Sequence, residues 1–184
     1  CWMSENLNIG NMISGNVNQS DNATIEKYCY NNNLSNCDNY GGLYQWFELM
    51  QYSTTQGTQG ICPNGWHIPT DEEWKILEGE VDSQYDYPNP EWDGTGWRGF
   101  DVGLRLKSSS GWINGGNGNN QFGFNVKGSG FCYGGIFYYL NEGGLFWTSN
   151  VTDAWDRHFS WTTNTSSRWI DSKYYGKAVR CLKD

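Results

Sequence analysis

Basic residues and long apolar runs are both scarce in this chain. Twelve Lys and Arg stand against 20 Asp and Glu, which gives a formal net charge of −8, and the basic residues form no run. A nucleic-acid-binding surface needs clustered basic side chains to meet phosphates, so we expect no nucleic-acid partner. No stretch reaches the ~20 apolar residues of a membrane-spanning helix. We therefore expect no membrane span in this segment, and no signal peptide is recognisable.

Histidine is also rare, with 2 residues, and the 6 cysteines form no CxxC pair. A zinc site is therefore not expected, because such sites need closely spaced Cys and His ligands. Cysteines in an acidic, Trp-rich chain indicate an oxidising compartment and disulfide bonds. Cys29 and Cys37 flank a short polar turn and are the natural local pair. The other four cysteines must then join distant segments.

Aromatic residues and glycine are abundant, with 11 Trp, 12 Tyr and 24 Gly among 184 residues. This length fits one domain over residues 1–184. Tyr and Trp supply rigid contact area with a polar atom, which suits a recognition surface, but they also suit a core that is short of aliphatic residues. The glycines and the clustered asparagines indicate long turns rather than long helices.

Two helices are predicted. The first is indicated by apolar residues at helical spacing, namely Leu43, Trp46, Phe47 and Met50. The second begins after Thr70, a good N-cap, and Glu73 completes a capping box. Trp74, Leu77 and Val81 would form its buried face. The helix dipole stabilises negative charges in the first turn, where Asp71, Glu72 and Glu73 lie. We expect these side chains mostly to face water.

The remaining segments are predicted as strands and loops. A first strand is expected at residues 2–7, followed by a polar surface excursion over residues 8–36. Residues 82–130 are rich in Gly, Asn and aromatics, and no helix is expected there. From residue 135 onward, GIFYYL, GLFWTS, RHFSWTT and KAVRCLKD are strand candidates separated by turns. The fold class is therefore α+β.

Several sequence motifs occur together in a recognisable order: WMSENL, YGGLYQW, ICPNGWHIPTDEEW, GLRLKS, FWTS, AWDRHF and GKAVRCLKD. They resemble the Fibrobacter succinogenes major paralogous domain over nearly the whole chain. The resemblance implies a secreted or cell-surface bacterial protein of Bacteroidetes-like lineages. It also implies a C-type lectin-like fold, in which two helices pack on a small twisted antiparallel sheet with a long Gly/Asn-rich loop region and stapling disulfides.

The resemblance further implies a disulfide between Cys62 and Cys181. Cys1 with Cys132 then follows by elimination as the third pair. The first residues, CWMSENL, look like a strand entered midway, so we expect the chain to be part of a longer secreted or surface protein. A lipid-modified N-terminal cysteine at Cys1 is the alternative interpretation.

Calcium is the one cofactor to consider. Sugar-binding C-type lectins hold calcium in short motifs, which this sequence does not match. Oxygen ligands are nevertheless plentiful over residues 82–120, and calcium needs several of them. Glu91, Asp93 and Asp101 are the candidate ligands, and the alternative is an acidic, solvated loop. His67 is expected on a short strand beneath the core, with its ring bonded to a backbone group.

In lectin-like folds the ligand face is built by the long loop and the strands next to the C-terminus. The matching stretches here mix aromatic side chains with short polar ones, as antibody paratopes do. At least half of these aromatics are expected in the core. We predict exposure for Trp169, Tyr174 and Tyr175. The predicted ligand-binding residues are Trp155, Trp169, Asp171, Lys173, Tyr174 and Tyr175, with Asn117 and Asn119 from the loop.

We therefore expect an extracellular binding or adhesion module that recognises carbohydrate or protein. The alternative is a structural domain that assembles with other domains or copies of the parent protein. Formylglycine-generating enzymes share the fold class and use cysteine chemistry. We expect no enzyme activity, because three disulfides would account for all six cysteines. The active-site motifs of that enzyme are also not found in the sequence.

Overall fold

The computed structural model describes residues 1–184. At its centre is a six-stranded sheet with strands in the order β4-β9-β8-β7-β5-β6. Its strands are β4 (Gly96–Arg98), β5 (Ser129–Tyr133), β6 (Ile136–Leu140), β7 (Gly143–Trp147), β8 (Trp155–Ser160) and β9 (Ser166–Ile170). Neighbouring strands are antiparallel except β5 and β7, which run parallel. The prediction of strands from residue 135 onward is confirmed for β6, β7 and β8. It missed β4, β5 and β9, and the sheet is larger than expected and not wholly antiparallel.

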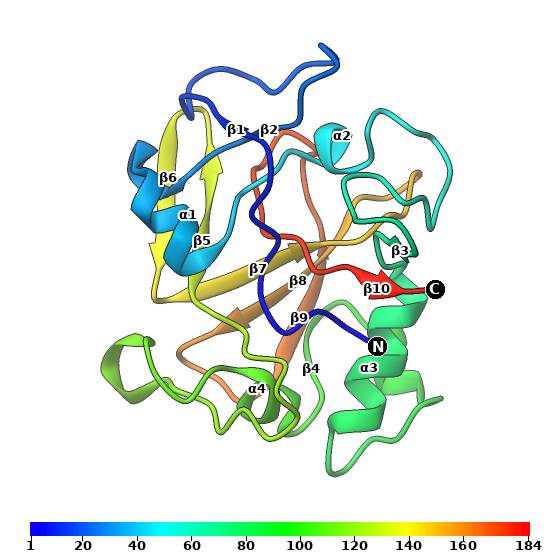
Figure 1. Cartoon of the computed structure of the whole chain (residues 1–184). Helices are drawn as coiled ribbons and strands as arrows, with labels where there is room; N and C mark the ends of the chain where they lie inside the picture. Colours follow the sequence, from blue (N-terminus) through cyan, green and yellow to red (C-terminus); the bar gives the residue numbers. More distant parts are fainter.

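Two short pairings lie outside this sheet. β1 (Asn11–Met12) pairs with β2 (Glu26–Lys27), and β3 (Trp66–His67) pairs with β10 (Leu182–Lys183). The strand expected at residues 2–7 is replaced by an extended segment that forms a single bridge from Trp2 to Leu182. The two termini consequently lie side by side (Figure 1).

The helices are short apart from one. They are α1 (Leu34–Tyr40), α2 (Trp46–Leu49), α3 (Asp71–Val81) and α4 (Val102–Leu106). The predicted capping box at the start of α3 is confirmed, because Thr70 accepts from the Glu73 amide while the Glu73 carboxylate accepts from the Thr70 amide. No helix is both long and apolar enough to cross a bilayer.

Two helix predictions need correction. The first predicted helix covers only four residues, because Gln51 and Tyr52 adopt positive φ angles of 48° and 57° that end it. The segment 82–130 was expected to hold no helix but contains α4. It also contains the 3₁₀ turns η2 (Pro90–Asp93) and η3 (Ile113–Gly115), and a third, η1 (Tyr30–Asn32), precedes α1.

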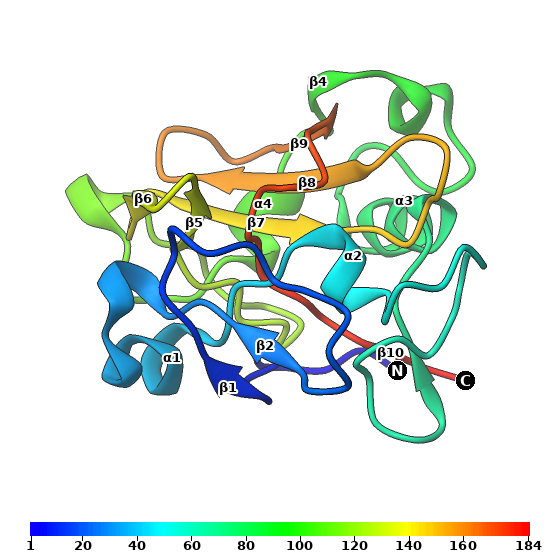
Figure 2. The same ribbon diagram turned by 90° about the horizontal axis from the view of Figure 1, so that it is seen from above.

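The core is divided between the two faces of the sheet. Trp147 packs with Tyr44, Trp46 and neighbouring apolar residues, whereas the adjacent Phe146 packs with Trp74 of α3. Successive residues of a strand point to opposite faces, so the two clusters lie on opposite sides of β7. Figure 2 shows α2, β1 and β2 on one side of the long strands β7 and β8.

Buried charges attach α3 to the sheet. Asp71 bonds Arg157 and Arg168, and Glu78 bonds Arg157 and Arg98, at 2.7–2.9 Å. All five side chains are at least nine-tenths buried. The prediction that the first-turn carboxylates face water is therefore wrong for Asp71. Burial opposes its ionisation, but the hydrogen bonds and charges of the arginines outweigh burial and lower the pKa of Asp71 to about 2.

Two of the three predicted disulfides are confirmed. Cys29 is bonded to Cys37, and Cys62 is bonded to Cys181. The second bond joins the segment before β3 to the last strand region, 119 residues further along the chain. It holds the N-terminal half of the chain to the C-terminal end.

The predicted bond between Cys1 and Cys132 is wrong, because both thiols are free. Cys1 is exposed beside β10, where its carbonyl accepts from the Lys183 amide. Cys132 is buried in β5, and Gly176 exchanges backbone hydrogen bonds with it. Elimination failed because each cysteine is fixed by a different part of the backbone network.

Candidate functional site

One face of the sheet carries the candidate site. In β8, Arg157 and Phe159 point toward α3 and the core, so Asp156, His158 and Ser160 point to the opposite face. Cross-strand pairing places Trp97 of β4 on that same face, since Trp97 pairs with Ser167 of β9 and Ser167 pairs with His158.

Aromatic rings run across this face from β4 to the β5–β6 hairpin. The ring-centroid distances are 5.2 Å for Trp97–His158, 6.1 Å for His158–Tyr139, 5.5 Å for Tyr139–Phe131, 5.0 Å for Phe131–Tyr138, 5.4 Å for Phe131–Tyr175 and 4.5 Å for Tyr175–Tyr133. All are within the range of favourable aromatic pairs. We call these residues (Trp97, Phe131, Tyr133, Tyr138, Tyr139, His158 and Tyr175) the aromatic band.

The band faces solvent. Trp97, Tyr133 and Tyr139 are 46%, 47% and 48% exposed. A set of neighbouring exposed aromatics is unusual on a protein surface and marks an interaction site more often than scattered apolar residues do. Because each ring packs against the next, the band is a rigid surface, and little side-chain entropy would be lost when a ligand covers it.

The backbone of the hairpin is shaped to present two successive rings together. Tyr139 has a φ of 64°, which interrupts the alternation of β6, and both Tyr138 and Tyr139 contact the ring of Phe131. Gly130 on β5 also has a positive φ, and a Cβ there would lie 2.2 Å from the Tyr138 carbonyl oxygen. A positive φ at a bulky residue is a strained conformation, and such conformations are enriched at functional sites.

A small hollow adjoins the middle of the band. Tyr139, Glu142, His158, Ser160 and Trp161 line its volume of about 160 Å³. Burial, with a smaller contribution from the charge of Lys177, lowers the pKa of His158 to about 4. The imidazole is thus neutral near pH 7, so it offers a ring face and hydrogen bonding rather than a charge.

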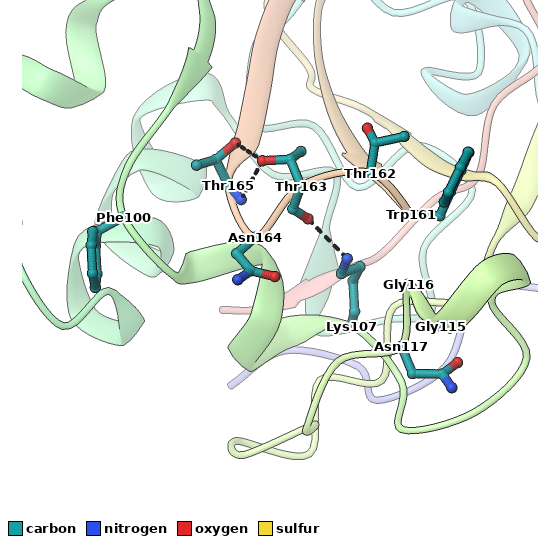
Figure 3. Close-up of a pocket in the computed structure, with 10 residues that line it drawn as sticks. All are labelled: Phe100, Lys107, Gly115, Gly116, Asn117, Trp161, Thr162, Thr163, Asn164 and Thr165. Atoms are coloured by element: carbon teal, nitrogen blue, oxygen red, sulfur yellow. Dashed lines mark hydrogen bonds between the residues drawn. The ribbon is translucent and has the colours of Figure 1, made fainter.

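Trp161 lines both this hollow and a second one of about 390 Å³, which we call the larger hollow. Figure 3 shows the residues 162–165 along one side of the larger hollow, Asn117 and the neighbouring glycines on another, and Lys107 between them. The Lys107 ammonium donates to the carbonyl oxygens of Ser160 and Thr163 at 2.8 and 2.9 Å. Burial lowers the pKa of Lys107 to about 8.

A third hollow lies at the other end of the band, and its volume of about 400 Å³ is similar to that of the larger hollow. It is lined by Asn18, Tyr133, Gly134 and Tyr174. The Tyr174 ring packs on Phe47 of α2 at a centroid distance of 5.9 Å. Hydroxyl and amide groups line the hollows, and the aromatic rings of the band lie between them. This chemistry can bind a ligand that combines ring faces with many hydroxyl or amide groups.

Comparison with known proteins gives the family. The model of the Fibrobacter succinogenes major domain matches residues 1–183. The chain belongs to this family. No curated protein and no solved structure matches it.

Three of the predicted ligand residues lie on or beside the aromatic band of this Fibrobacter succinogenes major domain. Tyr175 is part of the band, although it is only partly exposed. Tyr174 is 53% exposed and shares a hollow with Tyr133 of the band. Trp169 is 49% exposed and pairs with Asp156, which puts it on the same face of the sheet. The predicted exposure is confirmed for Trp169 and Tyr174.

Three other predicted ligand residues have different surroundings. Trp155 lies on the opposite face, where the Arg168 guanidinium stacks on its ring at 3.4 Å. Asp171 accepts from the buried Lys177 ammonium at 2.5 Å. Lys173 donates to a backbone carbonyl and lies over the Trp46 ring at 4.0 Å. These three side chains support the frame of the site rather than its open surface.

The two predicted loop asparagines are separated in the same way. Asn117 lines the larger hollow of the domain, and its side-chain Oδ1 accepts from the Trp112 backbone amide at 3.0 Å. Asn119 accepts from the Gln121 amide two residues further on and lies outside the hollow. The sequence therefore located one of these two asparagines at a hollow.

The candidate calcium ligands do not form a group that could hold a metal ion. Glu91 accepts from the Gly99 amide, and Asp93 pairs with Lys75. Asp101 pairs with Arg105 at 2.8 Å and also accepts from Ser83. Each carboxylate is engaged with a different donor, so the structure does not bring these three candidate ligands together.

His67 was expected to bond a backbone group, and this is wrong as well. Its ring nitrogens bond the carboxylates of Glu73 and Asp184 at 2.9 and 2.7 Å. Partial burial opposes protonation, but these two hydrogen bonds outweigh it and raise the pKa of His67. The residue joins the start of α3 to the chain end and lies away from the band.

Most of the band was not found from the sequence. Trp97 was hidden in a segment assigned as loop, and Phe131 precedes the first predicted strand of the sheet. The signal that could have revealed the hairpin is the run FCYGGIFYY, in which two glycines separate aromatic, β-favouring residues.

Proposed function

We propose that this domain is a non-enzymatic binding module of a bacterial extracellular or cell-surface protein, and that its ligand is a carbohydrate. The exposed aromatic band is the observation that carries the proposal. Flat aromatic faces suit the apolar faces of sugar rings, and the hydroxyl and amide groups lining the adjoining hollows suit sugar hydroxyls. A protein ligand is the second candidate, because exposed aromatics also form the energetic centre of protein interfaces.

A C-type lectin-like fold is part of this proposal. The disulfide from Cys62 to Cys181 and the adjacent termini support it. So does the use of the long 82–130 segment and the last strands to build one surface. The extracellular location is supported by the two disulfides, which form and persist mainly in oxidising compartments.

A glycan array probed with the wild-type domain and with a Trp97→Ser/Tyr139→Asn double variant tests the proposal. Asn is chosen at position 139 because it tolerates a positive φ better than other polar residues. We expect binding to a defined class of glycans and a loss of about 30-fold or more in the variant, as for buried aromatic anchors.

Phe122→Ser is the matched control, because Phe122 is 50% exposed but lies outside the band. It should bind as the wild type does. Carbohydrate recognition is overturned if the wild type binds no glycan, or if the double variant binds as well as the control. Sedimentation of the same samples would then identify ordered self-association, the mark of an assembly domain.

A further inference from the structure

The larger hollow has an unusual charge for this protein. The chain carries a net charge of −8, yet no carboxylate lines the hollow, and its only titratable side chain is Lys107. The other lining residues are glycines, threonines and asparagines, with Trp161 and Phe100 as aromatic walls. A hollow whose lining contains a lysine and no carboxylate is a locally positive site.

Lys107 is buried without a counter-ion. It is 1% exposed, and its ammonium contacts only two carbonyl oxygens and the Trp112 ring, whose centroid lies at 5.2 Å. Four other buried cations, Arg98, Arg157, Arg168 and Lys177, each pair with a carboxylate. Lys27 and Arg180 are the other two buried cations that have no carboxylate pair. A buried cation that lacks an anion is destabilised by desolvation, and an anionic ligand would relieve this.

We propose that the larger hollow binds the acidic group of the ligand, a carboxylate or sulfate ester on a sugar, with Lys107 as its counter-ion. Residues 162–165 and Asn117 provide hydroxyl and amide groups for the rest of that sugar unit. Trp161 joins the hollow to the aromatic band through the smaller hollow that it also lines. This inference rests on the proposed function, because it names the class of glycan that the same surface selects.

Matched ligands separate charge from shape. Isothermal titration would compare trigalacturonic acid with its methyl ester, which has nearly the same shape but no charge. A sulfated disaccharide is the third probe and tells a carboxylate site from a sulfate site. We expect one of the two anionic probes to bind roughly tenfold or more tightly than the ester, as for a hydrogen bond to a charged group.

Two variants assign the effect to the hollow. Lys107→Met removes the ammonium and retains an apolar chain of similar length, so the preference for the acid over the ester should disappear. Asn164→Tyr fills the hollow from an exposed position whose side chain makes no hydrogen bond, and it should weaken both ligands without touching Lys107. Thermal melting of both variants checks that they fold.

The pH dependence provides an independent readout. The loop 111–120 and the turn 161–165 carry no titratable side chain, and on α4 the nearby Arg105 is paired with Asp101. His158 of β8 stays neutral above about pH 4, and Glu142 lines the smaller hollow but not the larger one. Lys107 loses its charge as the pH rises through about 8, so affinity for the acid should fall between pH 7 and pH 9. Affinity for the methyl ester should not change.

The outcomes distinguish the two proposals. Equal binding of acid and ester, or an unchanged preference in folded Lys107→Met, overturns the inference and leaves carbohydrate binding by the band intact. Absence of binding to every acidic and neutral glycan overturns both. Binding of neutral glycans that the Trp97→Ser/Tyr139→Asn variant loses supports the band alone and contradicts an acidic ligand.

Discussion

At the scale of single residues, Asp71 and Glu78 are the most informative side chains outside the binding surface. They lie seven residues apart on α3 and meet three arginines from three strands. Removing one member of a buried charge network leaves its partners without compensation. The network therefore fixes the orientation of α3 on the sheet, and through β8 and β9 it also fixes the face that carries the aromatic band.

Asp71→Asn should destabilise the domain by about 3–5 kcal/mol, because Arg157 and Arg168 would remain buried without their shared carboxylate. Urea unfolding followed by tryptophan fluorescence measures the change. Glu72→Gln is the control one residue away, at an exposed carboxylate that pairs with Lys75 and accepts from the Tyr87 hydroxyl, and it should change stability by less than about 1 kcal/mol.

The same carboxylate gives a pH dependence. Its folded-state pKa of about 2 lies below the ordinary value of 3.8, so its contribution to stability is present above pH 4. It is lost as the pH falls from about 4 to about 2. The Asp71→Asn variant should show a smaller loss of stability over this range than the wild type. An equal loss in both proteins would contradict the assignment.

The two free cysteines give a second prediction at this scale. Cys1 is exposed, whereas burial raises the pKa of the Cys132 thiol to about 11. A thiol reagent should modify one cysteine in the folded protein and a second only after unfolding. Detection of no free thiol under denaturing conditions would instead support a bond between these two residues.

At the scale of elements, α3 and the β5–β6 hairpin differ in how strongly their own sequences specify them. α3 has a capping box, acidic residues in its first turn and a good helix-forming composition. The hairpin depends on positive φ angles at Gly130 and Tyr139 and on contacts with distant residues such as Tyr175. α3 is thus fixed locally, and the hairpin is fixed by its surroundings.

Thr70→Ala should destabilise the domain by about 1 kcal/mol, because the side-chain acceptor for the Glu73 amide is lost. Thermal or urea unfolding measures this value. Thr152→Ala, at an exposed threonine in the β7–β8 connection, should have almost no effect. A loss at position 70 no larger than that at position 152 would show that the cap does not stabilise α3.

At the scale of the whole molecule, contacts between distant parts of the chain hold the site. The Cys62–Cys181 bond spans 119 residues, and the N-terminal segment pairs with the C-terminal one. The band itself combines residues from β4, β5, β6 and β8 with Tyr175 near the chain end. Its geometry therefore depends on the complete fold.

Replacing Cys62 and Cys181 together by alanine should destabilise the domain by about 2–5 kcal/mol. The matched control replaces Cys29 and Cys37, whose bond spans only 8 residues. In the chain-entropy model its loss should be smaller by roughly 2 kcal/mol. Chemical unfolding of the two variants compares them, and a larger effect at the short bond would contradict the model.

The sequence by itself determined the features that depend on neighbouring residues. The capping box of Thr70 and Glu73, the local Cys29–Cys37 bond and the strands β6, β7 and β8 were predicted correctly. The resemblance to a family supplied Cys62–Cys181. Each depends on short-range periodicity, capping chemistry or a recognisable motif.

Tertiary structure decided the rest. Only the sheet register placed Trp97, His158 and Tyr139 in one band, and only the packing of α3 showed that Asp71 is buried among arginines. Other long-range contacts left Lys107 without a counter-ion and kept Cys1 apart from Cys132. Composition cannot show these features, because whether an aromatic or charged side chain becomes core or surface depends on which distant residues cover it.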